Sequence, residues 1–387
     1  MKKDQKEKKA KKSKKNRSFL GRLLVVVLTI LAVIGLIAMA LSVASSYIDP
    51  VKFVWTAYFG LAFWVIFIYN LVLLALLLLL WSKKVWVAVV AILISIPGVY
   101  KSFSAGKPND GGELRIMSYN VMNFKDITDL EKTPEEVADH IANVVLEYHP
   151  DVLCVQEIAL LKPKTSRKDC FERYSEALKF PYLYYHTKKN FCGNVIFSKY
   201  PLTALEEGDP LGEEKDYGAV VKVDAGKKGV FYVICVHLTS FQLTNDELTV
   251  FYDTGNSKEE VKTYSKSIFV KLKAAYEKRS QEVSSILADI PHDGRPIVLC
   301  GDFNDTPLSY TYHQIKRAGF TDGFVKAGWG IGHTYAGKLP LLRIDYIWGN
   351  EQIQPMGFKR LKFKGSDHYP VIMDFNVNHG LYAGIGL

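Results

Sequence analysis

Cysteine is scarce in this 387-residue sequence, and no cysteine–histidine spacing in it suits a zinc site. Of the five cysteines, Cys154, Cys235 and Cys300 each lie in a short apolar run, which indicates small buried side chains. Cys170 and Cys192 lie in more polar stretches, and the sequence does not decide whether they form a disulfide. Internal repeats are also missing, and the only low-complexity segment is a lysine-rich start. These absences disfavour a disulfide framework, a zinc domain and a repeat array.

An excess of basic charge is missing from the main part of the chain, although the formal net charge is +9. The first 17 residues hold ten Lys or Arg against two acidic residues, and the apolar region that follows to Gly106 adds a net charge of +4. Residues 107–387 therefore carry a net charge of −3. A groove for duplex DNA needs clustered Lys and Arg to replace the counterions of the phosphates, so the overall charge gives no support to a DNA-binding protein.

Charged residues are absent from two long apolar runs near the N-terminus. Leu23–Ala44 has 22 residues and Phe53–Trp81 has 29, and each exceeds the roughly 20 residues that cross a hydrocarbon core. Val85–Tyr100 is a third run of 16 residues, marginal in length and interrupted by Pro97. A signal peptide is disfavoured for the first run, because its apolar part is too long and a second run follows. The sequence therefore predicts about three transmembrane helices.

Basic residues beside these runs predict the orientation in the membrane. The tail of residues 1–17 and the pair Lys83–Lys84 should both stay in the cytoplasm, which predicts a multi-pass protein with an extracytoplasmic main domain. If Val85–Tyr100 only lies in the interface, the main domain stays inside. The tail should also touch anionic lipid. We divide the chain into a basic cytoplasmic tail (1–17), a transmembrane region (18–103), a linker (104–112), a main domain (113–377) and a C-terminal tail (378–387).

Strands and helices alternate after the linker. Thr133–Glu136 is a capping box with proline at the first helical position, and it predicts a helix whose apolar face carries Val137 and Ile141. A second, long helix is predicted over about Ser267–Asp289, after a loop over Ser240–Lys266. Strands outnumber helices, so the pattern predicts two packed sheets with helices outside. The predicted strands cover 114–120, 151–156, 195–197, 219–223, 230–236, 297–300, 344–348 and 371–375.

Polar side chains form six clusters along this part of the chain, four at the ends of apolar strands and two after the short segments Arg343–Ile344 and Gly365–Ser366. They are Asn120, Glu157, His237, Asp302 with Asn304, Asp345, and Asp367 with His368. Each alone has a structural explanation as a turn cap or a satisfied core histidine. Together, four carboxylates, two imidazoles and two amides fit a phosphoester hydrolase that uses a hard cation such as Mg²⁺. This chemistry needs an activated water, a cation on the developing charge and a proton source.

These residues lie in motifs that resemble the endonuclease/exonuclease/phosphatase superfamily, the deoxyribonuclease-I-like fold. The motifs are Ser118-Tyr119-Asn120, Val155-Gln156-Glu157, Gly193-Asn194, Val236-His237-Leu238, Gly301-Asp302-Phe303-Asn304, Arg343-Ile344-Asp345-Tyr346 and Ser366-Asp367-His368. The match runs from about Glu113 to Val377 and leaves out the apolar runs and the tail, as in a membrane-anchored member of bacterial type. The resemblance implies a four-layer α/β sandwich, two central β-sheets flanked by helices, preceded here by about three transmembrane helices.

The resemblance also implies how a metal ion and the substrate are held. Glu157 would be the principal Mg²⁺ ligand, supported by Asn120 and Asp367, with Mn²⁺ as the alternative ion. Asn194 follows a glycine in the stretch Gly193–Leu202 and would contact a substrate phosphate. The carboxylates that the family pattern requires are all present, which gives no sign of an inactive enzyme.

Five further residues would carry the catalytic steps under the same resemblance. Asp302 would orient or deprotonate the attacking water, and Asn304 would hold a phosphate oxygen. Asp345 would pair with His368 and fix its tautomer, so that the imidazole binds or protonates the phosphate. His237 would act as a second phosphate-binding or acid group.

Three functions stay open from the sequence. The first is a membrane-anchored hydrolase of lipid head groups or other small phosphoesters, favoured by the apolar runs and the acidic domain. The second is a membrane-tethered nuclease acting on DNA or RNA, since the superfamily includes many nucleases. The third is a non-catalytic membrane scaffold. The motifs determine the phosphoester chemistry and not the leaving group, and the lipid bilayer is the one partner besides substrate that the sequence predicts.

Overall fold

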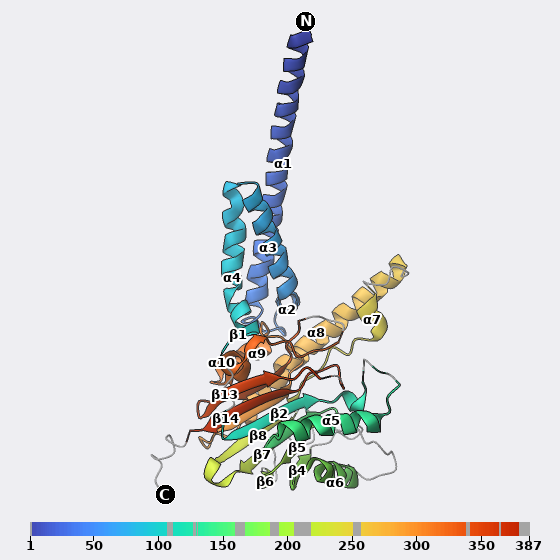
Figure 1. Ribbon diagram of the computed structural model, residues 1–387, viewed down its shortest axis with the longest axis vertical. Coiled ribbons are helices and arrows are strands. Elements are labelled where there is room, and N and C mark those ends of the chain that lie inside the picture. Colours follow the sequence, from blue (N-terminus) through green and yellow to red (C-terminus); the bar gives the residue numbers. More distant parts are fainter. Residues whose placement is uncertain are drawn as a thin grey trace.

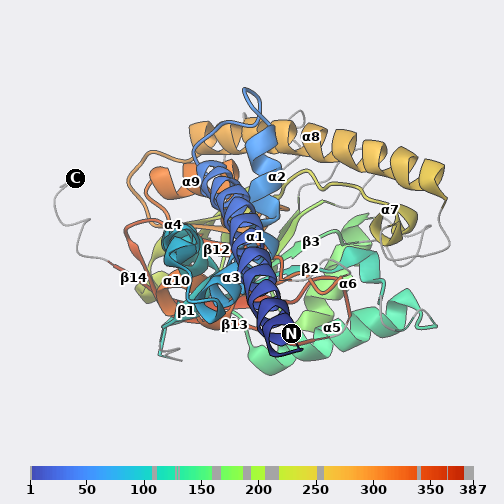
Figure 2. The ribbon, with the colours of Figure 1, turned by 90° about the horizontal axis from the view of Figure 1, so that it is seen from above.

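The computed structural model describes residues 2–106, 111–126, 129, 131–158, 167–185, 193–204, 218–250, 257–337, 341–363 and 365–378. A bundle of N-terminal helices stands on one side of a two-sheet domain, and the N-terminus lies at the far end of the bundle (Figure 1). Seen from above, the bundle lies over the body of the domain, between the long helix α8 and the helix α5 (Figure 2).

Four α-helices precede the sheets. They are α1 (Lys2–Ala44), α2 (Trp55–Leu61), α3 (Phe63–Leu79) and α4 (Trp86–Ser102), with the 3₁₀ turn η1 (Lys83–Val85) before α4. In the described part of the chain, Phe19–Ala44 and Lys83–Ser102 are long and apolar enough to cross a membrane. Helices α2 and α3 together form a third candidate span, bent by 68°.

The run expected as the second span, Phe53–Trp81, is therefore broken into two helices. The break falls at Ala62, between α2 and α3. Helix α2 leaves the axis of the bundle because its start packs on the main domain, where Ala57 is buried against Leu272 and Tyr276. The bend follows from a contact between regions about 200 residues apart, which the local sequence does not reveal.

Two six-stranded sheets form the main domain. The first has the order β13-β14-β2-β3-β5-β4 and the second the order β10-β12-β9-β8-β7-β6. One central pair in each sheet is parallel, β2 with β3 and β8 with β9, and the other pairs are antiparallel. The strands of the first sheet are β2 (Leu114–Asn120), β3 (Val152–Gln156), β4 (Tyr182–Tyr185), β5 (Val195–Ser198), β13 (Ile353–Arg360) and β14 (Val371–Val377). Those of the second are β6 (Leu202–Ala204), β7 (Gly218–Asp224), β8 (Val230–His237), β9 (Ile297–Asp302), β10 (Thr321–Asp322) and β12 (Asp345–Gly349).

The sheets pack face to face, and helices cover their outer faces. Between them lies an apolar core that includes Cys154, Cys235 and Cys300, so the prediction of small buried side chains at these cysteines is confirmed. Helices α5 (Pro134–Tyr148) and α6 (Arg167–Leu178) cover the first sheet, and α8 (Lys258–Asp289) and α9 (Tyr310–Arg317) cover the second. The predicted four-layer α/β sandwich is confirmed.

Several segments differ from the expectations. The segment expected as a linker overlaps a short strand, β1 (Phe103–Ala105), which pairs with β11 (Trp329–Ile331). The expected loop over Ser240–Lys266 contains the helix α7 (Asn245–Thr249) and the first turns of α8. Cys170 is buried with a free thiol, and Cys192 lies outside the described residues. The remaining short elements are η2 (Met122–Phe124), η3 (Gly226–Lys228) and α10 (Gly323–Ala327).

Candidate active site

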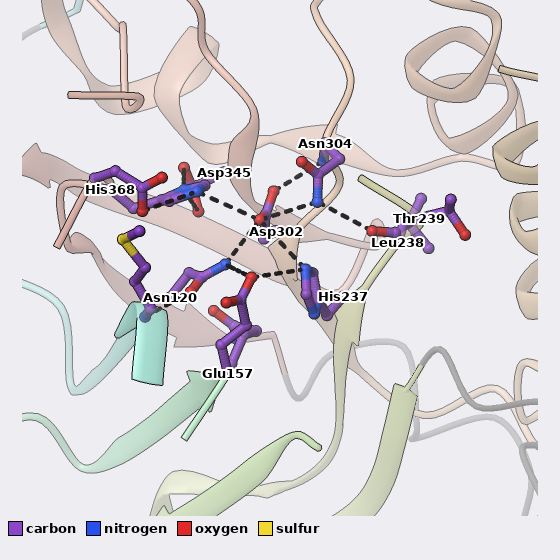
Figure 3. Close-up of polar contacts among 12 residues, drawn as sticks. Asn120, Glu157, His237, Leu238, Thr239, Asp302, Asn304, Asp345 and His368 are labelled. Carbon is purple, nitrogen blue, oxygen red and sulfur yellow. Dashed lines mark hydrogen bonds and ion pairs between the residues drawn. The ribbon is translucent and has the colours of Figure 1, made fainter. Parts of the chain in front are cut away.

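The predicted catalytic residues meet at one edge of the two sheets (Figure 3). The parallel pair β8 and β9 places His237 opposite Asp302, and the antiparallel strand β12 places Asp345 opposite Asp302 as well. In the other sheet, β2 ends at Asn120 and its parallel neighbour β3 ends just before Glu157. Parallel neighbours end at the same edge of a sheet, so these strands bring residues distant in sequence together.

A glycine lets β9 reach this edge beside β8. Gly301 has a φ of +139°, a region that favours glycine, and a Cβ there would overlap the carbonyl oxygen of Val236. A side chain at this position would push β9 away from β8. The glycine of the Gly-Asp-Phe-Asn motif therefore sets the spacing between His237 and Asp302.

Asp302 lies at the centre of the cluster and is 1% exposed. Its Oδ2 atom accepts hydrogen bonds from Nδ2 of Asn120 at 3.0 Å and from Nδ2 of Asn304 at 3.1 Å. The Nε2 atoms of His368 and His237 lie 3.6 and 3.7 Å from the same oxygen. Burial raises the pKa of Asp302 above its ordinary value, and although His368 opposes this shift, it remains. A carboxylate with a raised pKa is suited to take a proton from water.

Glu157 stands beside Asp302 in a left-handed backbone conformation, with a φ of +53°. Its Oε1 atom accepts a hydrogen bond from Nδ2 of Asn120 at 3.0 Å and lies 3.4 Å from Nε2 of His237. Asn120 thus binds both carboxylates through one nitrogen, while its Oδ1 atom accepts from the backbone N–H of Met122 at 3.0 Å. This geometry makes Asn120 an orienting residue, and its role as a metal ligand stays a prediction.

His368 and Asp345 form a buried pair, as predicted. Nδ1 of the imidazole lies 3.1 and 2.9 Å from the two carboxylate oxygens. Burial lowers the pKa of His368, but the negative charges of Asp345 and Asp302 outweigh burial and raise this pKa well above its ordinary value. The imidazole therefore favours its protonated form, which suits a group that binds or protonates a phosphate oxygen.

Among the described residues, no lysine or arginine pairs with the carboxylates at this edge. Four carboxylates and two imidazoles gather here, and no Lys or Arg among the described residues lies within 4.0 Å of any of these carboxylates. Two groups of three side chains could each hold a metal ion, because the ligand atoms within each group lie within 4.8 Å of one another. Asp302 belongs to both groups. An oxygen-rich set without a lysine or arginine partner suits a divalent cation such as Mg²⁺. The two groups are Glu157, His237 and Asp302, and Asp302, Asp345 and His368.

Two predicted residues lie at the margin of the cluster. Asp367 belongs to neither group, and its side chain, 20% exposed, lines the cleft with Oδ1 3.9 Å from Nε2 of His368. Asn194 is buried and does not line the cleft, and its Nδ2 atom donates to the carbonyl oxygen of Cys235 at 3.2 Å. Metal binding by Asp367 and phosphate binding by Asn194 stay predictions.

A cleft of about 210 Å³ opens beside these residues. One part of its lining is the acidic cluster, and another part is apolar, with Phe241, Leu243, Leu248 and Leu342. The cleft therefore offers a charged end for a phosphate and an apolar surface for the group attached to it.

Three residues of the site were missed by sequence reasoning. Tyr335 lines the cleft with its ring edge-on to His368, at 5.6 Å between ring centroids, and burial raises its pKa to about 12. Thr334 Oγ1 accepts hydrogen bonds from the backbone N–H groups that begin β12, including that of Asp345 at 3.0 Å. Ser366 Oγ donates to the carbonyl oxygen of Asn120 at 2.7 Å. Only Ser366 stood inside a motif and had a sequence signal.

Residues 117–368 match the model of the Endonuclease/Exonuclease/phosphatase family, and this stretch contains every residue of the site described above. The chain belongs to the endonuclease/exonuclease/phosphatase family. Members of this family are metal-dependent phosphoester hydrolases, so the chain is an enzyme of that class. Residues 22–102 match a second model, "Domain of unknown function (DUF8431)". None of the curated proteins compared with the chain matches it.

Solved structures of family members resemble the chain at low sequence identity. An endonuclease/exonuclease/phosphatase from Beutenbergia cavernae is 18% identical, with 68% of this chain and 72% of that chain covered and a TM-score of 0.47. The human Nocturnin catalytic domain with bound sulfate is 17% identical, with coverages of 68% and 94% and a TM-score of 0.48. A mannosyl-6-phosphatase from Bacteroides thetaiotaomicron is 15% identical, with coverages of 68% and 99% and a TM-score of 0.46.

Proposed function

We propose that this family member is a membrane-anchored, Mg²⁺-dependent hydrolase of phosphoesters at the membrane surface, with lipid head groups as its first substrate class. One observation carries the proposal: loops that bear the site also rest on the apolar helices. Leu342 lines the catalytic cleft and also a crevice shared with Gly60, Phe63 and Trp64 of those helices. A head group at the surface of a bilayer around the helices would therefore lie close to the cleft.

A second loop of the site makes the same connection. Asn304 holds Asp302, and four residues later Leu308 packs on Met39 and Phe63 of the helices. The carbonyl oxygen of Leu308 also accepts a hydrogen bond from Ser45 Oγ at the end of α1. The catalytic motif and the helical bundle thus share one short loop, which supports a site that works beside the membrane.

The roles of the residues follow from their geometry. Asp302 would take a proton from the attacking water, because burial raises its pKa and its other contacts hold it in place. His368, fixed by Asp345, would bind a phosphate oxygen or protonate the leaving oxygen through Nε2. Glu157, supported by Asn120 and Asp367, would hold the divalent ion, and Mn²⁺ is the expected substitute for Mg²⁺. When bound, the ion would neutralise charge on the phosphate oxygens.

The apolar part of the cleft supports a lipid substrate over a free phosphate ester. Phe241 and Leu243 lie in the segment between β8 and α7, and Leu248 belongs to α7 itself. Glu247 holds α7 on α8 through Lys271 Nζ at 2.8 Å and Ser267 Oγ at 2.5 Å. An apolar surface held beside the acidic cluster suits a glycerol or ceramide portion next to a phosphate.

A membrane-tethered nuclease is the second candidate, favoured by the family description. The net charge of −3 over residues 107–387 opposes it, and so does the position of one basic pair. The pair Lys227–Lys228 lies in the turn between β7 and β8, at the opposite end of β8 from His237. A strand of eight residues separates the two by roughly 25 Å, so this pair does not join a basic stripe beside the site. A second pair, Lys359–Arg360, ends β13 at the edge of the first sheet where β2 ends at Asn120.

The orientation across the membrane stays part of the proposal. The start of α1 and the turn between α3 and α4 lie at one end of the bundle, and the main domain lies at the other (Figure 1). With the basic tail in the cytoplasm, three crossings place the catalytic domain outside it. The arrangement supports a multi-pass protein with an extracytoplasmic active site.

A substrate panel tests the proposal. Purified full-length protein in liposomes would be assayed with Mg²⁺ on phosphatidylinositol, sphingomyelin, soluble inositol phosphates, plasmid DNA and RNA. We expect hydrolysis of a lipid phosphoester that stops in EDTA, with Asp302→Asn as the inactive control. Cleavage of nucleic acid without lipid hydrolysis would make the protein a tethered nuclease, and equal turnover in EDTA would remove the metal from the proposal.

A further inference from the structure

The main domain exposes few large apolar side chains, and two of them lie on one short strand. Among the described residues after Gly106, only Tyr182, Val270, Trp329 and Ile331 are large, apolar and exposed. Trp329 is 67% exposed and Ile331 is 45% exposed, and both belong to β11. Packing in the core of the domain does not explain a tryptophan with this exposure, which points to a contact outside the domain.

The partner strand completes an apolar face. In the antiparallel pair of β1 and β11, Phe103 stands opposite Ile331 and Ala105 opposite Trp329. Directly opposed residues of an antiparallel pair point to the same side, so all four side chains share one face. All four are exposed, and Phe103 is 42% exposed. The residue between them on β1, Ser104, is buried on the other face and donates to the carbonyl oxygen of Val325.

This face continues the surface of a candidate membrane span without a break. Strand β1 follows α4 directly, and the span Lys83–Ser102 ends at the residue before Phe103. Tyr100 and Ile96 near the end of α4 are 62% and 54% exposed. An open apolar groove of about 590 Å³ joins the helices to the strand, with Phe67, Ile96 and Phe103 in its lining.

Other exposed aromatic residues lie near the two ends of the helical bundle. Tyr47 and Trp55 lie near the segment that joins α1 to α2, at the end of the bundle beside the main domain, and both are exposed. Trp81 and Trp86 are exposed at the opposite end of the bundle. Tryptophan and tyrosine are enriched where a membrane meets water, because their rings have an apolar body and a polar atom. Two groups at the two ends of a helical bundle match the two interfaces of one bilayer.

We propose that the ribbon of β1 and β11 is a second membrane attachment of the catalytic domain, with Trp329, Ile331 and Phe103 inserted into the boundary between head groups and acyl chains. The occupant of this face is the lipid bilayer. The proposal rests on the proposed function only in requiring that the helices span a membrane. Attachment through both the helices and the ribbon would hold the catalytic domain in one orientation. It would also keep the cleft at a constant distance from the lipid head groups.

Tryptophan fluorescence of the full-length protein in liposomes tests this attachment. The chain has six tryptophans, and subtracting the emission of Trp329→Phe from that of the wild type isolates the signal of Trp329. Liposomes of phosphatidylcholine brominated at carbons 6 and 7 of an acyl chain quench tryptophans that reach the upper acyl region, and aqueous iodide quenches those in water. We expect the Trp329 signal to be quenched strongly by the brominated lipid and weakly by iodide.

A matched control comes from Tyr182, the other exposed aromatic residue among the described residues of the domain. Tyr182 is 40% exposed on β4, at the edge of the first sheet. The Tyr182→Trp substitution on the Trp329→Phe background should give a signal quenched by iodide and not by brominated lipid. Trp329→Phe keeps an aromatic ring and lies outside the catalytic cluster, so hydrolysis by this variant should stay within about twofold of the wild type.

Two outcomes would overturn the proposal. Quenching of Trp329 by iodide to the same extent as the control would place the ribbon in water. Protection from both quenchers, growing with the ratio of protein to lipid, would assign the face to a second copy of the chain. Four of the remaining tryptophans, Trp55, Trp64, Trp81 and Trp86, report separately on the helices, and quenching of none of them by brominated lipid would show that the membrane anchoring itself fails.

Discussion

Replacing Glu157 by Gln should make the metal-free enzyme more stable and the metal-bound enzyme less stable. The substitution keeps the shape of the side chain and an oxygen for the hydrogen bond from Asn120. It removes one of four carboxylates that have no Lys or Arg partner among the described residues. Without a cation, these negative charges repel one another.

The size of the effect follows from the distances. Carboxylate oxygens of Glu157 and Asp302 lie within 4.8 Å of each other, where two unit charges interact with about 3 kcal/mol at an effective dielectric constant of about 20. The Glu157 side chain is 30% exposed and His237 lies 3.4 Å away, so solvent and imidazole screen much of this repulsion. We expect the metal-free variant to gain about 1 kcal/mol, or about 2–4 °C in Tm.

The metal-bound state should show the opposite sign. A site filled at one hundred times its Kd stabilises a protein by about 2.7 kcal/mol, which corresponds to about 5–10 °C in Tm for a domain of this size. Glu157→Gln should lose most of this gain, because the variant lacks a charged ligand of the proposed site. The Tm values of wild type and variant should therefore cross between EDTA and saturating Mg²⁺.

The assay is thermal unfolding of the full-length protein in detergent, with EDTA and with a series of Mg²⁺ concentrations. Glu147→Gln is the matched control, because Glu147 is exposed on α5 and removal of its charge should leave both Tm values unchanged. An equal Mg²⁺-induced shift in variant and wild type would remove Glu157 from the metal site. A lower Tm of the variant in EDTA would show that its carboxylate is a structural partner instead.

Three further predictions concern the chemistry, the cleft and the topology. His368→Ala should lower kcat by about 10²–10⁴-fold without unfolding the protein, because the imidazole lies before β14 and lines the cleft. Unfolding of the variant would point to a structural role instead. Glu247→Gln should raise KM on a liposomal substrate by about tenfold with little change in kcat, because the substitution weakens the contact that holds α7 on Lys271. An unchanged KM would show that α7 does not contact the substrate. A reporter fused after Leu387 should be active outside the cytoplasm, and activity only inside would show that the last helix does not cross.

The layers of the fold could be predicted because their signals are local. Apolar runs ending in polar residues marked the strands, and the box at Thr133 marked the start of α5, where both of its reciprocal hydrogen bonds form. The same kind of signal stood at Thr244 and Ser257, where α7 and α8 begin, and was overlooked inside a stretch taken as a loop. The bend at Ala62 had no local signal, because the packing of α2 on α8 causes it.

The site was predictable as a set of residues and not as a set of contacts. Strand ends were enough to bring Asp302, His368 and their partners to one edge. The register between two sheets decides which atoms face one another, and no pattern in the sequence contains that register. For this reason, the sequence did not show that Asn120 turns its side-chain nitrogen toward the carboxylates of Glu157 and Asp302, or that Asp367 lies at the rim of the cleft. Tyr335 was missed because it follows no apolar strand and reaches the site by a bridge to His368.

The N-terminal helices are part of the scaffold of the active site. Arg343 lies two residues before Asp345 and is 3% exposed. Its guanidinium donates to the carbonyl oxygen of Lys101 at the end of α4 and to the carboxylate of Asp322, both at 2.7 Å. Arg279 of α8 is fully buried, and its Nε atom lies 3.4 Å from Oδ2 of Asp305. Asp305 follows Asn304 in the sequence.

Both arginines lie between the helical bundle and a loop that carries a catalytic residue. Arg279 also lies over the ring of Tyr276, which contacts Tyr58 of α2. A fragment without the helices would expose the apolar side chain of Leu308 and leave Arg343 without its contact to α4. A change in the tilt of α4 would act on the loop before Asp345 through one buried hydrogen bond. The position of the helices and the geometry of the catalytic pair are therefore coupled by direct contacts.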